Sequence, residues 1–499
     1  MSDRGRRLII GVAVTIVVLV VFLRFLSGFF VDYLWHQSVS RTDVFWGVLG
    51  AKATLFGIFA AVFIVLAVLN LIIADRLAPT SFSANTHPVV ERFHQFFGRR
   101  LRVFRIGVAV VLGLLVAAPT TGHWQEWLMF RNSKSFGVND AQFGNDVGFY
   151  LFKFPFVSFV LDWLYLCLVL VVVLVVATHV LSGGIVLQPP RPKVRRATKA
   201  HVAVLLALLA VVKAASYWVS RYELVNTNRG SFTGPSYAVV NAELPSLLLL
   251  ALIALLTAAL FLSTLKTDHW RPAVVASALW VVVALLGGVI YPAVMQSLVV
   301  NPNKKDKEAT YIARNIEATR QALGLQSVDV QQVSFSPITA SSVSSSVSAL
   351  QDVRYVKPDD LMVSRFRNDR GKPGQTINDL DPDRYVVDGA VRQVIVGAPE
   401  LDLTQVGNKS WQGTHLISTH GCGLAMAPAN QIKPTGDLVY RDDIVKITRP
   451  ELYFSPSLSG YAVLNTSVAE QPCDGQQVAP YKGGAGVQLN SGLRRLAFA

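Results

Sequence analysis

Seven long apolar stretches in the first 300 residues constrain this chain more than any other feature. Most of them exceed the roughly 20 residues that a helix needs to cross a hydrocarbon core of about 30 Å. They are Leu8–Val31, Trp46–Ala74, Ile106–Thr121, Phe154–Leu181, His201–Ser220, Leu244–Leu265 and Pro272–Leu298. A chain that is 52% hydrophobic and only 16% charged is too apolar for a single soluble domain. We therefore predict a polytopic α-helical membrane protein with a seven-helix transmembrane domain over residues 1–299.

The charge distribution predicts the orientation of these stretches. The net charge is +14, yet residues 301–499 hold 21 basic and 20 acidic residues, so the excess belongs to residues 1–300. Sixteen basic residues fall on one side of the stretches: before the first, and in the connections between the second and third, the fourth and fifth, and the sixth and seventh. The loops on the opposite side hold six. The positive-inside rule then places the N-terminus in the cytoplasm and residues 300–499 outside the plasma membrane. Anionic lipid accounts for such basic segments, so we expect no nucleic-acid partner.

Beyond residue 300 the sequence predicts an α+β extracytoplasmic domain, over residues 300–499. Glu308–Leu323 has the pattern of an amphipathic helix, and the Ser-rich segment Ser334–Ser348 is typical of a loop. Asp388 and Gly389 lie between two alternating apolar runs, which indicates a β-hairpin. Further short strands are expected around THGCGLAMAP and ELYF. The apolar ending GLRRLAFA has no stop signal, so we expect this domain to be incomplete at its C-terminus.

The three cysteines fall in different environments. Cys167 lies within an apolar stretch, where a packing role is expected. Cys422 and Cys473 both fall in the predicted extracytoplasmic domain, where disulfides persist. A disulfide between them is one interpretation, and two free thiols are the other.

Three connections carry aromatic patterns of their own. Glu91–Arg100 and His123–Arg131 are expected to form short helices along a membrane surface. The loop Phe136–Phe156 (FGVNDAQFGNDVGFYLFKFPF) places carboxylates and amides at spacings typical of Asx turns, among seven aromatic residues. We expect an ordered outer loop that docks the extracytoplasmic domain on the bundle, with a ligand site at its rim as the second interpretation.

Catalytic and metal-binding signatures are weak throughout the chain. HExxH, GxSxG and P-loop patterns are absent from the sequence. His415, His420 and Cys422 could offer metal ligands around a short strand, but a structural role and a glycine turn are the better interpretation. The acidic run from Asp379 to Asp388 lacks the glycine of a calcium loop, which favours a turn that leads into the hairpin. We therefore predict no cofactor, no metal and no catalytic residues.

Four charged residues fall inside the apolar stretches at similar depths. Arg24, Lys52, Asp162 and Lys213 each lie six to eight residues from the predicted outer end, or roughly 9–12 Å at 1.5 Å per residue. A charge at such depth usually pairs or lines a wet cavity. We predict an outer polar vestibule with a net positive lining, in which Asp162 pairs with Lys213. Alternatively, the basic side chains extend to the headgroups and have no further role.

Several motifs together resemble one family. In chain order they are the loop Phe136–Phe156, NPNKKDKEATYIARNIEATRQAL, DPDRYVVDG, THGCGLAMAP, TRPELYF and GVQLNSGLRRLAFA. They resemble the bacterial uncharacterised protein family (UPF) zero-one-eight-two, which is common in actinobacteria. The resemblance covers nearly the whole chain and implies seven N-terminal spans, a large extracellular domain and members longer than this chain. It implies no activity.

Three function classes follow from these features. The first is a membrane protein that binds or moves an envelope lipid or another hydrophobic or anionic solute, and the vestibule favours it. The second is a scaffold or assembly factor that binds other envelope proteins. A membrane-bound enzyme that acts on an envelope substrate ranks last, because no catalytic set has persuasive spacing. The expected partners are the lipid bilayer and an envelope lipid or envelope proteins.

Overall fold

The computed structural model describes residues 3–78, 100–186, 193–228, 232–267, 269–347, 353–473, 475 and 477–498. The chain forms two compact units, Met1–Asp329 with Val487–Ala499 and Val330–Gly486, and each is considered by itself. The division between the units falls after Asp329, so the helical segment that follows the last apolar stretch is grouped with the long helices. The expected helix Glu91–Arg100 lies almost wholly outside the described residues.

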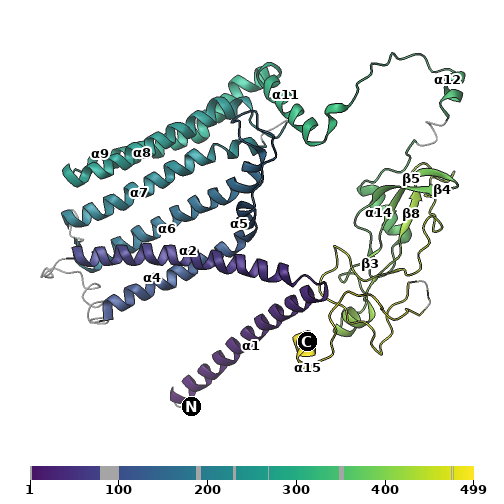
Figure 1. Ribbon diagram of the computed structural model, residues 1–499, viewed down its shortest axis with the longest axis horizontal. Helices are drawn as coiled ribbons and strands as arrows, with labels where there is room; N and C mark the ends of the chain where they lie inside the picture. The colour runs from purple at the N-terminus through teal and green to yellow at the C-terminus, as the bar shows by residue number, and fades with distance from the viewer. Residues whose placement is uncertain are drawn as a thin grey trace. The chain divides into compact units, whose positions relative to one another are not determined.

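The first unit contains seven helical segments that are long and apolar enough to cross a membrane, counted over the described residues. Figure 1 shows the long helices from α2 to α9 side by side as a row, with the short helix α5 at their ends. The long helices are α1 (Asp3–Ser38), α2 (Thr42–Leu77), α4 (Leu101–Ala117), α6 (Phe154–Leu181), α7 (Arg196–Ser220), α8 (Leu244–Thr267) and α9 (Arg271–Leu285). All seven predicted stretches are confirmed as helices. Their length and composition are compatible with a multi-pass membrane protein.

Two ends of this bundle can be defined by its connections (Figure 1). The basic end carries the α2–α4, α6–α7 and α8–α9 connections, and the short strands β1 (Ile185–Val186) and β2 (Lys193–Val194) lie there. The loop end carries the α4–α6 and α7–α8 connections. The short helices of the loop end are η2 (Ala118–His123), α5 (Trp124–Arg131), η3 (Phe149–Lys153), η4 (Glu223–Asn226) and η5 (Val239–Glu243). The helix predicted over His123–Arg131 is thus confirmed as α5.

The last apolar stretch is interrupted by π-helical turns. After α9 the chain continues through η6 (Leu286–Ile290), α10 (Tyr291–Val294), η7 (Met295–Val300) and η8 (Asn301–Asn303). Each π turn widens the helix and redirects the side chains that follow it. In the described part of this unit, four such turns occur, at η3, η5, η6 and η7. Turns of this kind are frequent at functional sites.

The helices pack through small and aromatic residues and leave apolar side chains exposed on their outer faces. Phe59 of α2 meets Trp163 of α6 edge to face, with ring centroids 4.5 Å apart. Gly113 of α4 lets α2 approach, because a Cβ atom there would lie 2.5 Å from Ile64. Val21 and Leu252, in contrast, are each 64% exposed. Such surfaces suit lipid tails rather than water.

Helix α11 (Lys304–Ala322) confirms the predicted amphipathic helix and contacts the connections of the loop end. Glu308 is 2% exposed and accepts a hydrogen bond from the backbone N–H of Tyr237 at 3.1 Å. Asn315 donates to the carbonyl oxygen of Thr233 at 2.6 Å. The helix is followed by η9 (Leu325–Ser327). In the same unit, α15 (Gly492–Phe498) contacts α1, where Ser27 donates to the carbonyl oxygen of Ala497.

The second unit is α+β, with short strands and two clusters of buried apolar residues in its described part. Its sheets have the orders β3–β6, β4–β5–β8 and β7–β9, and all pairs are antiparallel. The Asp388–Gly389 hairpin is confirmed: Val387 pairs with Ala390, and both turn residues have positive φ (52° and 78°). The elements are α12 (Ala340–Ser345), α14 (Asp360–Arg370), β3 (Gln375–Thr376), β4 (Asp381–Val387), β5 (Ala390–Gly397), β6 (Glu400–Leu401), η10 (Gly413–Ile417), β7 (Gly421–Cys422), β8 (Ala425–Pro428) and β9 (Glu451–Leu452).

Two local predictions in this unit are wrong. The Ser-rich segment is not entirely loop, because Thr339 and Ser342 form a capping box that starts α12. The acidic run is not a turn, because Asp381 and Asp383 lie on β4 and pair with β5.

Candidate functional site

A pocket of about 310 Å³ lies at the loop end, where α7 ends and α8 begins, against η6. Leu224, Leu247 and Leu250 give it apolar walls. The rest of its lining consists of Ser220, Glu223, Thr227, Glu243, Ser246 and Gly288. The pocket therefore combines a hydrocarbon surface with carboxylates and hydroxyls, as ligand sites usually do.

The π turns η5 and η6 shape this pocket. Turn η5 ends at Glu243, which is 9% exposed and leads directly into α8. One turn further on, the Ser246 hydroxyl donates to the carbonyl oxygen of Ala242 at 2.7 Å. On the facing turn η6, a Cβ atom at Gly287 would lie 3.2 Å from the Ser246 hydroxyl, so glycine permits the close approach of the two helices. A Cβ atom at Gly288 would meet nothing within 4 Å, which leaves this side of the pocket open.

The charged residues in the pocket lining are acidic. Two carboxylates, Glu223 and Glu243, contribute to the lining, and no lysine or arginine does among the residues that the structure describes. An anionic headgroup would be repelled by the exposed Glu223 carboxylate, whereas hydroxyl and ammonium donors would be attracted.

The four charged residues predicted to form a cluster do not line this pocket. Arg24 and Asp162 are exposed on α1 and α6. Lys213 lies over the rings of Tyr165 and Tyr217, with its ammonium 5.3 and 5.0 Å from their centroids.

Asp162 and Lys213 form no ion pair in the described part of the chain, so the predicted pairing is corrected. The two tyrosine faces take the place of the carboxylate as neighbours of the cation. Lys52 is similarly placed, with its ammonium 6.0 Å from the ring centroid of Trp124.

The loop Phe136–Phe156 forms the Asx turns that the sequence predicts. The Asp140 carboxylate accepts from the backbone N–H groups of Gln142, Phe143 and Asn145 and from the Tyr150 hydroxyl, at 2.7–2.9 Å. Phe143 and Phe149 pack edge to face on Tyr222, with centroids 5.2 and 5.1 Å away. Because Tyr222 precedes Glu223 in the chain, this loop supports one wall of the pocket. Gln142 also accepts from Arg314 of α11 at 3.2 Å.

Asp146 connects the two ends of this loop through hydrogen bonds. We therefore predict that the stability of the loop falls at acid pH. Its carboxylate accepts from the Ser135 hydroxyl and from the backbone N–H groups of Phe136, Gly148 and Gly137, which lowers its pKa from 3.8 to about 2. Because the folded pKa is lowered, the stabilisation is complete above about pH 4 and is lost as the pH falls towards 2.

We therefore expect Asp146→Asn to lower the thermal unfolding temperature at pH 6, and the difference from wild type to shrink at pH 2. Thermal unfolding of both proteins at the two pH values is the measurement. An equal difference at both values would contradict this account of the loop.

A buried polar network at the basic end was missed by the sequence analysis. The Arg105 guanidinium on α4 pairs with the Asp75 carboxylate on α2 and donates to the Ser182 hydroxyl at 2.9 Å. Beside it, Nε2 of His179 lies 3.2 Å from Nδ1 of His201. The network extends on both sides, from Thr198 to Nδ1 of His179 (3.3 Å) and from Nε2 of His201 to Asn70 (3.0 Å). It thus connects α2, α4, α6 and α7.

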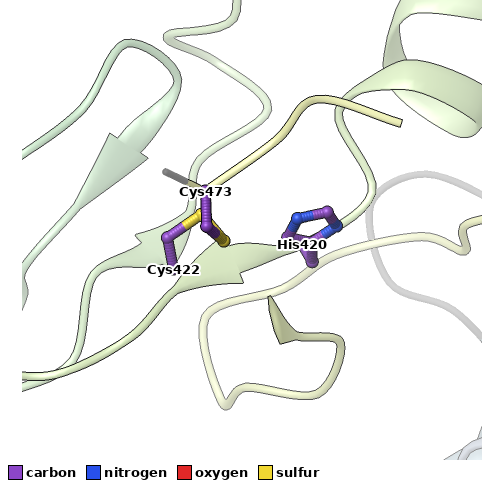
Figure 2. A group of neighbouring side chains, drawn as sticks. All are labelled: His420, Cys422 and Cys473. Carbon is purple, nitrogen blue, oxygen red and sulfur yellow. A yellow bond between two sulfur atoms is a disulfide. The ribbon is translucent and has the colours of Figure 1, made fainter. Parts of the chain in front are cut away.

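In the second unit, the structure separates the histidines that the sequence grouped. His415 lies on the π turn η10, stacked on Trp411, and not beside a strand. His420 is buried next to Cys422 and Cys473, which are joined as a disulfide with Cα atoms 5.4 Å apart (Figure 2). Gly423 has φ 72°, as the glycine-turn interpretation predicts. Cys167 is buried in α6 as a free thiol.

Comparison with known proteins identifies a family but no related solved structure. The profile of the Uncharacterised protein family (UPF0182) matches residues 9–499. A UPF0182 protein of Frankia casuarinae is 32% identical over 99% of this chain and 50% of its own length. One from Streptomyces coelicolor is 30% identical over 100% of this chain and 52% of its own. The chain thus spans about half the length of these curated relatives. No solved structure matches it.

Proposed function

This chain belongs to the Uncharacterised protein family (UPF0182), and we propose that it is a multi-pass plasma-membrane protein that binds or moves an amphiphilic envelope solute. The observation that carries the proposal is the pocket between α7, α8 and η6. It lies within a bundle whose outer faces are apolar, so a solute with a hydrocarbon tail could enter from the bilayer.

The lining favours one class of headgroup. Leu224 and Leu250 are 7% and 3% exposed and form a dry floor. Glu223 provides a carboxylate acceptor in the same lining, together with three hydroxyl groups. Carboxylates accept hydrogen bonds from hydroxyl and ammonium groups and repel phosphate. The solute would therefore be an envelope lipid with a neutral polyhydroxyl or a cationic headgroup, and not the anionic solute of the sequence prediction.

The proposed orientation rests on the basic residues of the connections. The basic residues at the basic end favour a cytoplasmic position for that end, and the loop end would then face outward. The pocket would open near the outer headgroups, and the second unit would be extracytoplasmic. The Cys422–Cys473 disulfide supports this side, because such bonds persist in oxidising compartments. In this scheme the chain is a binding or transport protein and not an enzyme.

The experiment is native mass spectrometry of the chain, purified from membranes in a mild detergent. Wild type should carry a lipid adduct with the mass of a neutral or cationic lipid. Gly288 lines the pocket, and a Cβ atom there meets nothing within 4 Å, so Gly288→Phe can add a ring at the pocket wall. This variant should reduce the adduct at least about 10-fold, the effect of losing some 1.4 kcal/mol. Leu286→Phe is the matched control, because this residue of the same π turn is 51% exposed.

Two results would contradict the proposal. Equal lipid adducts on wild type and Gly288→Phe would place the lipid elsewhere on the bundle. An anionic lipid displaced by Gly288→Phe would confirm the pocket and overturn the proposed headgroup class.

A further inference from the structure

A second site, independent of the pocket, surrounds the disulfide of the second unit. His420 is 4% exposed, and Cys422 and Cys473 are 8% exposed each. One ligand atom from each of the three residues lies within 4.8 Å of the others. Figure 2 shows the imidazole ring beside the two sulfur atoms, with one ring nitrogen on the side that faces them.

The hydrogen bonds of His420 leave one nitrogen for a ligand. Its Nδ1 lies 2.9 Å from the Thr419 hydroxyl and 3.4 Å from the Glu470 carboxylate. Glu470 is itself held, since it accepts from Thr419 at 2.6 Å and from Tyr453 at 3.1 Å. Nε2 is buried and has no hydrogen-bond partner among the described residues. A buried polar atom without a partner is costly, and this one belongs to a side chain beside two sulfur atoms.

This arrangement matches a known pattern of metal ligation. A histidine that binds a metal through one nitrogen usually donates its other N–H to a carboxylate, which fixes the ring. Thiolate and imidazole ligands together select thiophilic cations such as Zn²⁺ and Cu⁺. Zn–S and Zn–N bonds of about 2.3 and 2.0 Å require ligand atoms roughly 3.5–3.8 Å apart. Disulfide sulfurs cannot serve, because the thiolate is the ligand.

We propose that reduction of the Cys422–Cys473 disulfide creates a binding site for a thiophilic cation, with both thiolates and Nε2 of His420 as ligands. A dithiol reductant supplies two electrons and two protons, breaks the S–S bond, leaves two thiols and becomes a disulfide itself. Binding of the cation then releases the two thiol protons. Glu470 acts as a positioning residue through Nδ1 of His420. In the reverse direction a disulfide oxidant accepts two electrons from the two thiolates and two protons from solvent, and becomes a dithiol. The Cys422–Cys473 bond re-forms and the ion leaves, so the site reports the redox state around the second unit.

The test uses the full chain in detergent. It is reduced with a phosphine, desalted without oxygen and titrated with Zn²⁺, and separately with Cu⁺, against a chromophoric chelator. The reduced protein should bind one ion per chain, and the oxidised protein should bind none at this site. His420→Ala should weaken binding at least about 10-fold, and Glu470→Gln about 10-fold through loss of orientation. His415→Ala is the matched control and should bind as wild type does.

Near-ultraviolet circular dichroism, recorded in parallel, shows whether the reduced protein keeps its fold. A folded, reduced protein that binds neither ion would overturn the proposal, and so would His420→Ala with wild-type affinity. Reduction that unfolds the second unit, with no recovery on addition of either ion, would overturn it as well.

Discussion

Replacing Arg105 by leucine is expected to destabilise the helical bundle by about 3 kcal/mol, because the substitution leaves the Asp75 carboxylate without its cation in a nearly dry site. The Arg105 side chain is 8% exposed and that of Asp75 is 23% exposed. Arg105 also donates to Ser182, so one side chain joins α2, α4 and α6. The free energy of unfolding by sodium dodecyl sulfate in mixed micelles is the measurement.

Two further variants make this prediction specific. Arg102→Leu removes an exposed arginine from the same helix and should change the free energy of unfolding little. The double variant Asp75→Leu with Arg105→Leu should recover most of the lost stability, because two apolar side chains often replace a buried ion pair at little cost. If Arg105→Leu and Arg102→Leu behave alike, the basic-end network does not stabilise the bundle.

The second large effect is expected in the other unit. Phe366 of α14 is fully buried and packs edge to face on Tyr440, with ring centroids 5.1 Å apart. Phe366→Ala should lower the free energy of unfolding of this unit by about 3–5 kcal/mol through the cavity that it leaves.

The control is Leu361→Ala on the same helix, where the side chain is 78% exposed and a change within about 0.5 kcal/mol is expected. Limited proteolysis of the full chain in urea, with the second unit followed by its fragments, measures both variants. Equal losses for the two variants would place Phe366 outside the core.

The sequence predicts those features that depend on neighbours along the chain. Seven apolar stretches, each longer than a hydrocarbon core requires or close to it, leave few alternatives to a helical bundle. The Asp388–Gly389 turn is equally local, because both residues tolerate the positive φ that they adopt. The Asx turns of Asp140 and Asp146 depend on partners within eleven residues.

The polar contacts between helices could not be predicted in this way. Asn70 and His201 are 131 residues apart, and their contact depends on the rotation of α2 and α7 about their own axes. The same uncertainty applies to Asp162 and Lys213: the two residues lie at matching depths on neighbouring helices, but the ammonium of Lys213 lies over the rings of Tyr165 and Tyr217. The position of His179 and His201 near the adjoining ends of two consecutive stretches was the one available signal for the basic-end network.

The pocket could not be predicted from the sequence, for a related reason. Its shape depends on the π turns η5 and η6, which follow no residue pattern as clear as a glycine turn. Its polar lining comes from residues near the ends of the apolar stretches, where serines, threonines and glutamates are common. The charged residues inside the apolar stretches are mostly lysine and arginine, and they led to the prediction of a positively charged site. The carboxylates that line the pocket lie at the ends of the stretches instead.

The central claim is that the pocket between α7, α8 and η6 holds a lipid-like solute. The most direct measurement is a cryo-electron microscopy map of the chain extracted with its native lipids into nanodiscs. We predict elongated density along Leu247 and Leu250, with its polar end beside Glu243. A map that shows the pocket empty, or closed by the surrounding side chains in the presence of native lipid, would contradict the claim.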